Sequence, residues 1–130
     1  MEFTTLKSSA AENIAGKNFK VTGCTVSPAL NGETDYFATW SSCSKDDIFR
    51  FEKGGVFIYD EGPSKCATTD PQTTNGTWAL LNGDKQLFVT FNNSPTTYDI
   101  VKNDGVDLIF KFSSESGGIV YTFTYVSKAF

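Results

Sequence analysis

The chain has 130 residues, the size of one domain, with 15 % aromatic residues including twelve Phe, and a formal net charge of −4. Frequent Phe, Thr and Val favour strands over helices, and the acidic balance argues against a protein that binds the phosphate backbone of nucleic acid. The chain has no histidine, the commonest general base and metal ligand, so we expect no enzyme, no cofactor and no metal site. No apolar run approaches the roughly 18 residues of a membrane-spanning helix, and we expect no transmembrane segment.

Polar residues dominate positions 1–14, which we interpret as a flexible or briefly helical lead-in, with a plug for one end of the fold as a lesser alternative. The first strand is predicted over 17–26, with Phe19, Val21 and Gly23 on one face and Lys20, Thr22 and Cys24 on the other. Residues 27–42 are predicted as a long loop. Its large apolar groups suggest a lid or plug across one end, and they are Tyr36, Phe37 and Trp40.

The segment from Cys43 to Cys66 is predicted as a hairpin. Two short runs of β-branched and aromatic residues, 48–51 and 56–59, flank Gly54-Gly55, which suit the positive φ of a tight turn. Antiparallel pairing brings the flanking cysteines together. A disulfide there closes a loop of about 24 residues, for which the chain-entropy model gives on the order of 3 kcal/mol. Cys24 is then the odd thiol.

Turn residues at near-even spacing separate the remaining strand candidates, so the chain carries eight short strands and no convincing helix. Such a series suggests a meander, and closing the sheet removes both open edges. The predicted fold is all-β, an eight-stranded antiparallel up-and-down barrel over 15–130, with a two-sheet sandwich as the alternative. The later strands are predicted at 76–80, 86–91, 97–101, 106–112 and 119–126.

Period-two alternation places one largely apolar face of every strand inward. An eight-stranded barrel has an interior that side chains fill or that holds one small ligand, and the alternation does not choose between these. If the barrel is hollow, the tyrosines supply polar anchors in an apolar cavity or place their hydroxyls at its rim. The predicted ligand-binding residues are Phe49, Phe57, Tyr59, Trp78, Phe91, Tyr98, Phe110, Tyr121 and Phe123.

One adjacent acidic pair, Asp46-Asp47, precedes an apolar strand. Neighbours in a strand point to opposite faces, so the two carboxylates are not expected to share one inward site. We interpret them as capping the hairpin edge or pairing with Lys45 or Lys65.

Several elements of this sequence resemble the bacterial lipocalin-like domain family, which comprises small secreted proteins or lipoproteins. They are Cys43 with Lys45-Asp46-Asp47, the Phe51-x-x-Gly-Gly turn, Tyr59-Asp60-Glu61-Gly62, Lys65-Cys66 and Gly76-Thr77-Trp78. The resemblance runs from about Ala15 to the C-terminus. It implies a calycin-type barrel with a disulfide between Cys43 and Cys66, and export through a signal peptide or a lipid anchor. It departs from better-known lipocalins, in which Gly-x-Trp lies in the first strand.

The resulting expectation is a non-enzymatic domain that binds a small hydrophobic molecule in the barrel. The alternative is a structural or protein-interaction domain with a filled barrel, which contacts its partner through 27–42. We expect a secreted, periplasmic or cell-surface protein, with a lipoprotein as one form, because structural disulfides imply an oxidising compartment. The start of the chain lacks the apolar segment of a signal peptide, and one hypothesis is that Met1-Glu2-Phe3 replaces a removed targeting or lipid-anchored segment.

Overall fold

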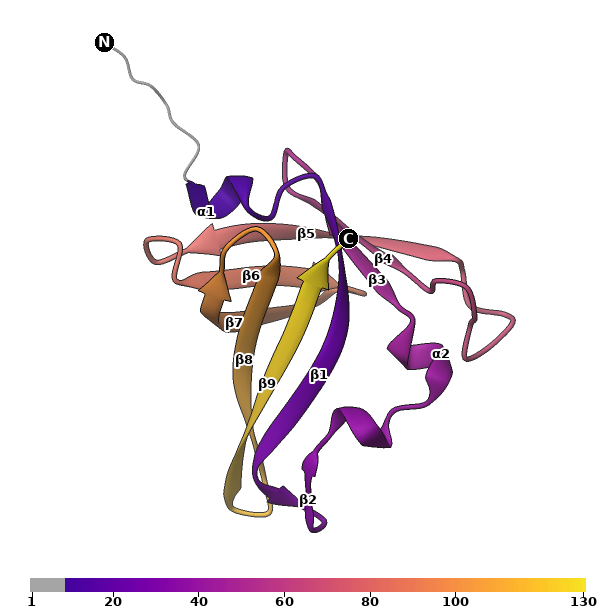
Figure 1. The fold of residues 1–130 in the computed structure, drawn as a ribbon, viewed down its shortest axis with the longest axis vertical. Coiled ribbons are helices and arrows are strands. Elements are labelled where there is room, and N and C mark those ends of the chain that lie inside the picture. Colours follow the sequence, from indigo (N-terminus) through magenta and orange to yellow (C-terminus); the bar gives the residue numbers. More distant parts are fainter. Residues whose placement is uncertain (1–8) are drawn as a thin grey trace.

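Antiparallel strands make up most of the computed structural model, which describes residues 9–130 (Figure 1). The expected lead-in at 1–14 therefore lies partly outside the described residues. Three short helices accompany the strands: α1 (Ser9–Glu12), the 3₁₀ helix η1 (Phe37–Thr39) and α2 (Ser42–Lys45). The strands are β1 (Lys17–Leu30), β2 (Glu33–Asp35), β3 (Ile48–Phe51), β4 (Val56–Asp60), β5 (Thr73–Leu81), β6 (Gln86–Phe91), β7 (Ser94–Asn103), β8 (Asp107–Ser116) and β9 (Ile119–Ala129).

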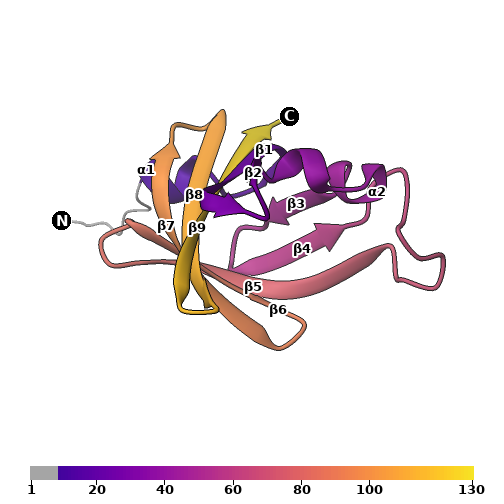
Figure 2. The same cartoon turned by 90° about the horizontal axis from the view of Figure 1, so that it is seen from below.

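The sheet is closed. From β3 to β9 each strand pairs with the next along the chain, and β1 pairs with both β3 and β9. Eight strands, all except β2, thus form the up-and-down barrel predicted from the sequence, and the sandwich alternative is wrong. Closure leaves no free edge in these eight strands. Seen from below, the strands surround a common interior, with α2 near the ends of β3 and β4 (Figure 2).

The β3–β4 hairpin has the predicted form. Phe49 pairs with Tyr59 and Phe51 with Phe57, while Gly54 and Gly55 adopt φ angles of 96° and 97°. These angles lie in the region that glycine occupies without a steric penalty. The Cys43–Cys66 disulfide is present, with the two Cα atoms 5.1 Å apart, and Cys24 is free and buried.

The predicted faces of β1 are wrong from Gly23 onward. A β-bulge lies between Val21 and Gly23 in the pairing with β9, so the alternation shifts by one residue. Cys24 and Val26 are therefore buried on the same side as Phe19, whereas the sequence pattern placed Cys24 on the polar face. A bulge inserts one unpaired residue and reverses the orientation of every later side chain.

The predicted long loop over 27–42 is largely structured. β1 continues to Leu30, the positive φ of Asn31 (53°) and Gly32 (80°) makes a tight turn, and β2 pairs back onto β1. η1 and α2 follow and lead to β3. The expectation of no helix is thus wrong for these short helices, whose single turns carry no long periodic pattern that the sequence could reveal.

The segment after α1 closes one end of the barrel. Ile14 has no exposed surface and belongs to the main core cluster. Asn13 Nδ2 donates to the carbonyl of Asn103 (3.0 Å), and Lys17 Nζ donates to the carbonyl of Gly105 (3.0 Å), both in the turn region between β7 and β8. The described part of the lead-in therefore plugs one end of the barrel, which was the lesser of the two interpretations of this segment. The other buried members of the core are Phe19, Phe51, Phe57, Leu87, Val89, Leu108 and Phe110.

None of the helices within residues 9–130 has the length and apolar character needed to cross a membrane.

Candidate ligand-binding cavity

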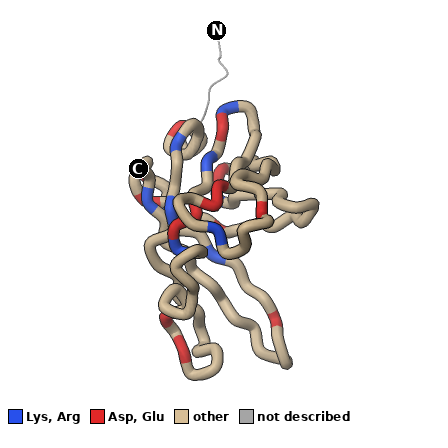
Figure 3. The backbone as a smooth tube through the Cα atoms, turned by 90° about the vertical axis from the view of Figure 1, so that its right-hand side faces the viewer, with Lys and Arg blue, Asp and Glu red and all other residues tan. Residues whose placement is uncertain are grey.

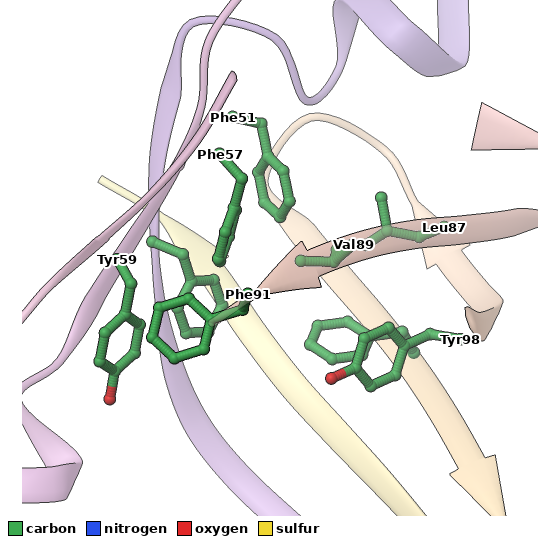
Figure 4. A pocket seen from close by; sticks show the side chains of 9 residues that line it. Phe51, Phe57, Tyr59, Leu87, Val89, Phe91 and Tyr98 are labelled. Carbon is green, nitrogen blue, oxygen red and sulfur yellow. The ribbon is translucent and has the colours of Figure 1, made fainter. Parts of the chain in front are cut away.

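An apolar cavity of about 260 Å³ lies inside the barrel (Figure 4). Its walls come from the inward positions of β3, β4, β6, β7 and β8, and the period-two pattern brings these side chains to one space. For scale, an engineered apolar cavity of about 150 Å³ holds a benzene molecule. The lining residues are Phe49, Phe51, Phe57, Tyr59, Leu87, Val89, Phe91, Tyr98 and Phe110.

Edge-to-face and tilted ring contacts hold the aromatic walls in place. Phe57 lies 5.3 Å from Phe51 and 6.2 Å from Phe91, and Tyr59 lies 5.0 Å from Phe91, all measured between ring centroids. Across the cavity, Tyr98 packs on Phe110 at 4.8 Å. These ring contacts define the shape of the space between the aromatic walls.

Six of the predicted ligand-binding residues line this cavity: Phe49, Phe57, Tyr59, Phe91, Tyr98 and Phe110. The other three lie elsewhere. Trp78 packs on Phe51 at 5.5 Å and donates its indole N–H to the carbonyl of Glu52 (2.8 Å) near the end that α1 covers. Phe123 stacks on Phe112 at 5.5 Å, and Tyr121 lies two residues closer to the β8–β9 turn.

A second, smaller cavity of about 190 Å³ adjoins the first at the side where α2 lies. The two share Phe49, Tyr59, Tyr98 and Phe110 as lining residues, so we treat them as the inner part and the mouth of one site. The mouth carries more polar groups than the inner part. Its remaining lining residues are Val21, Trp40, Ser44, Asp47 and Tyr125.

The three aromatics of the predicted partner loop pack against the barrel and one another. Tyr36 lies 5.1 Å from Phe123, and Trp40 lies 6.3 Å from Tyr125 and 5.1 Å from Phe37. Trp40 thereby forms one wall of the mouth. The sequence suggested a lid or a plug for this segment, and the observed packing is that of a lid.

Of the two roles predicted for the Asp46-Asp47 pair, the ion pair with Lys45 or Lys65 is wrong, whereas Asp46 caps the loop that follows the β3–β4 hairpin. Neither forms an ion pair with Lys45 or Lys65 in the part of the chain that the structure describes, and the pair follows α2 rather than lying in a strand. Asp46 Oδ2 accepts hydrogen bonds from the backbone N–H (3.1 Å) and hydroxyl (2.5 Å) of Ser64, which anchors the loop before Cys66. Asp47 is only 8 % exposed and lines the mouth.

A hydrogen bond from the Tyr59 hydroxyl to Asp47 Oδ2 links the mouth to the inner cavity. Figure 4 shows the Tyr59 hydroxyl pointing away from Phe57, whereas that of Tyr98 points toward Phe91. Burial raises the pKa of Asp47 to about 6, opposed by the hydrogen bond from Tyr59 and reinforced by the charge of Glu61. Burial also raises the pKa values of Tyr59, Tyr98 and Tyr125, so these phenols remain protonated at neutral pH.

Sequence reasoning missed part of this site. Phe51, Leu87 and Val89 also line the cavity. They stand at alternate positions with Phe49 in β3 and with Phe91 in β6, so the period-two pattern already places them inward, although the predicted ligand-binding set lacks them. Asp47 and Ser44 had no such signal, because their position depends on α2 and on the path of the chain from β2 to β3.

Comparisons with known proteins add no identification. A scan against models of protein families found no match, and a search of the curated proteins found none either.

Proposed function

We propose that this domain is a non-enzymatic binding module that holds one small apolar molecule inside its barrel. The observation that carries the proposal is the apolar cavity of about 260 Å³, which opens into the mouth beneath Trp40. Apolar burial drives binding at such a site, at roughly 25 cal/mol per Å² removed from water. The cavity size favours a molecule of one or two rings over a long-chain lipid.

Lipocalin-like membership and an extracytoplasmic location belong to the same proposal. The closed eight-stranded barrel and the Cys43–Cys66 disulfide are compatible with both. The alternative is a domain that contacts a protein partner through 27–42. It is less well supported, because the rings of Tyr36 and Trp40 already pack against Phe123 and Tyr125 of β9.

A fluorescent, uncharged probe tests the proposal. We expect the two-ring probe 6-propionyl-2-(dimethylamino)naphthalene to bind saturably at one site per chain, with enhanced emission and energy transfer from tryptophan. The Val89→Phe variant should bind at least about tenfold more weakly, because the larger side chain fills the inner cavity. Overpacking is expected to lower its free energy of unfolding by about 1–3 kcal/mol, so its folding is verified by circular dichroism.

The matched control is Val101→Phe, which makes the same change on the outer surface, where Val101 is 56 % exposed. This variant should bind the probe like the wild type. Unchanged binding by a folded Val89→Phe variant, or no binding by the wild type, would refute the proposed cavity.

A further inference from the structure

Among the residues that line the two cavities, Asp47 is the only acidic side chain. Tyr59 satisfies its Oδ2, but its buried Oδ1 accepts no hydrogen bond from the described residues. A buried carboxylate oxygen without a partner is unfavourable, since desolvation is not offset by a hydrogen bond. The mouth therefore contains an unused acceptor with a negative charge.

No ion pair involves Asp47 in the part of the chain that the structure describes. The nearest cationic side chain on α2, that of Lys45, instead has its Nζ 4.9 Å from the ring centroid of Phe37.

Further acidic groups add to the negative potential. Asp46, from the end of α2, and Asp60 and Glu61, from the end of β4, all act on Asp47 electrostatically and favour its protonation. Figure 3 views the side of the molecule on which α2 lies, and acidic segments gather near the centre of that face, with basic segments around them. A bound cation would relieve this repulsion.

Aromatic rings surround the same space. Trp40, Phe49, Tyr59, Tyr98 and Tyr125 all line the mouth together with Asp47. The faces of aromatic rings attract ammonium groups, and the attraction increases when water is excluded. A carboxylate within an aromatic enclosure thus suits an organic cation better than it suits an anion or a neutral molecule.

We infer that the molecule held in the barrel is an apolar amine in its protonated form. Its ammonium group donates a hydrogen bond to Asp47 Oδ1 in the mouth, and its hydrocarbon part occupies the inner cavity between Phe57, Val89 and Phe110. The inference deepens the proposed function and rests on it.

Three probes of nearly equal size test the inference by isothermal titration calorimetry at pH 7.5: 3-phenylpropylamine, 3-phenylpropan-1-ol and 3-phenylpropionate. The amine should bind at least about tenfold more tightly than the alcohol, since a charge-assisted hydrogen bond and a cation–π contact are gained, and the carboxylate should bind most weakly. Asp47→Asn should abolish the preference for the amine over the alcohol.

Asp99→Asn is the matched control, because Asp99 is exposed on the outer face of β7 and loses the same charge. It should leave the amine preference unchanged. A second measurement does not depend on any variant. Lowering the pH from 7.5 to 5 protonates Asp47 and should reduce the amine preference in the wild type, because the pKa of this carboxyl is about 6.

Equal affinities for amine and alcohol in the wild type would overturn the inference while the proposed cavity function stands. Failure of all three probes to bind would overturn both. A preference that survives in a folded Asp47→Asn variant, or that is lost equally in Asp99→Asn, would assign the effect to general surface charge and so reject the role of Asp47.

Discussion

At Gly76, in β5, there is no room for a side chain. A β-carbon built there would overlap the carbonyl of Thr90 on the paired strand β6. Gly76→Ala must therefore displace backbone, and we expect its free energy of unfolding to fall by about 1–3 kcal/mol. Chemical denaturation followed by circular dichroism measures this change.

Gly23→Ala provides the comparison within β1. The added β-carbon would meet Val126 Cβ at 3.9 Å, which is an ordinary contact distance. This variant should be as stable as the wild type or more stable by up to about 1 kcal/mol, because alanine restricts the unfolded chain. Equal losses in the two variants would show that the overlap at Gly76 is not the cause.

Asp47 makes stability depend on pH. Burial raises the pKa of this carboxyl from an ordinary value near 3.8 to about 6, so the folded protein binds the proton more tightly than the unfolded chain does. The free energy of unfolding should therefore fall as pH rises from about 4 to about 6, by up to roughly 3 kcal/mol. An ionised carboxylate that lowers the free energy of unfolding at neutral pH is expected of a group whose role is to contact a ligand.

Urea denaturation at pH values between 4.5 and 7.5 measures this effect. Asp47→Asn should lose the fall in stability over this window, whereas Asp99→Asn should keep it. Asp104 and Asp107 have lowered pKa values, through hydrogen bonds from backbone N–H groups and from Lys128 respectively, so their stabilisation is lost only at lower pH. A pH profile that is the same in wild type and Asp47→Asn would show that another group causes the slope.

At the scale of elements, the disulfide ties α2 to the loop that leads from β4 to β5. Cys43 and Cys66 are 23 positions apart, and cross-linking them restricts the unfolded chain, by about 3 kcal/mol in the chain-entropy model. The variant carrying Cys43→Ala and Cys66→Ala should be less stable than the wild type by about this amount. Denaturation with and without reductant checks the cause, because reductant should destabilise the wild type only. No effect of reductant on the wild type would contradict this account.

The plug formed by the residues after α1 makes a separate contribution. Ile14 has no exposed surface, so Ile14→Ala leaves a cavity in the core and should cost about 2–5 kcal/mol. Ile119→Ala is the matched control, since Ile119 is 46 % exposed at the start of β9, and it should cost less than about 0.5 kcal/mol. Urea unfolding of both variants gives the comparison, and a small loss at Ile14 would mean that this end of the barrel is not closed in solution.

The elements that the sequence predicted well share one property. Each is a strand whose inward face alternates with a polar face and whose turn is short, as in β3 and β4 around Gly54-Gly55. Where the prediction was wrong, local pattern was insufficient. The bulge between Val21 and Gly23 depends on pairing with β9 about a hundred residues later, and the placement of α2 and Asp46 depends on the disulfide and on the hydrogen bonds from Ser64.

At the scale of the molecule, strand number and spacing were sufficient to predict closure, since an open eight-stranded sheet would expose two edges. They did not decide whether the barrel is hollow. That property depends on how Phe57, Phe91 and Phe110 pack together, and a change of a few ångströms in ring positions separates a filled core from a cavity of about 260 Å³.

Closure also predicts how the domain unfolds. Since β1 pairs with β9 along most of its length, from Phe19–Ala129 to Ser27–Thr122, neither end of the barrel should open independently. The two tryptophans report on different places: Trp40 on the mouth and Trp78 on the end that α1 covers. We therefore expect Trp40 and Trp78 to report the same single, cooperative unfolding transition.

Single-tryptophan variants make the measurement. Trp78→Phe leaves only Trp40 and Trp40→Phe leaves only Trp78, and in each variant the urea midpoint from fluorescence should coincide with that from far-ultraviolet circular dichroism. Comparing two probes within one variant removes the effect of the substitution on stability. A lower fluorescence midpoint for Trp40 alone would mean that the lid over the mouth, formed by η1 and α2, opens before the barrel does, and ligand entry would then take place through that local opening.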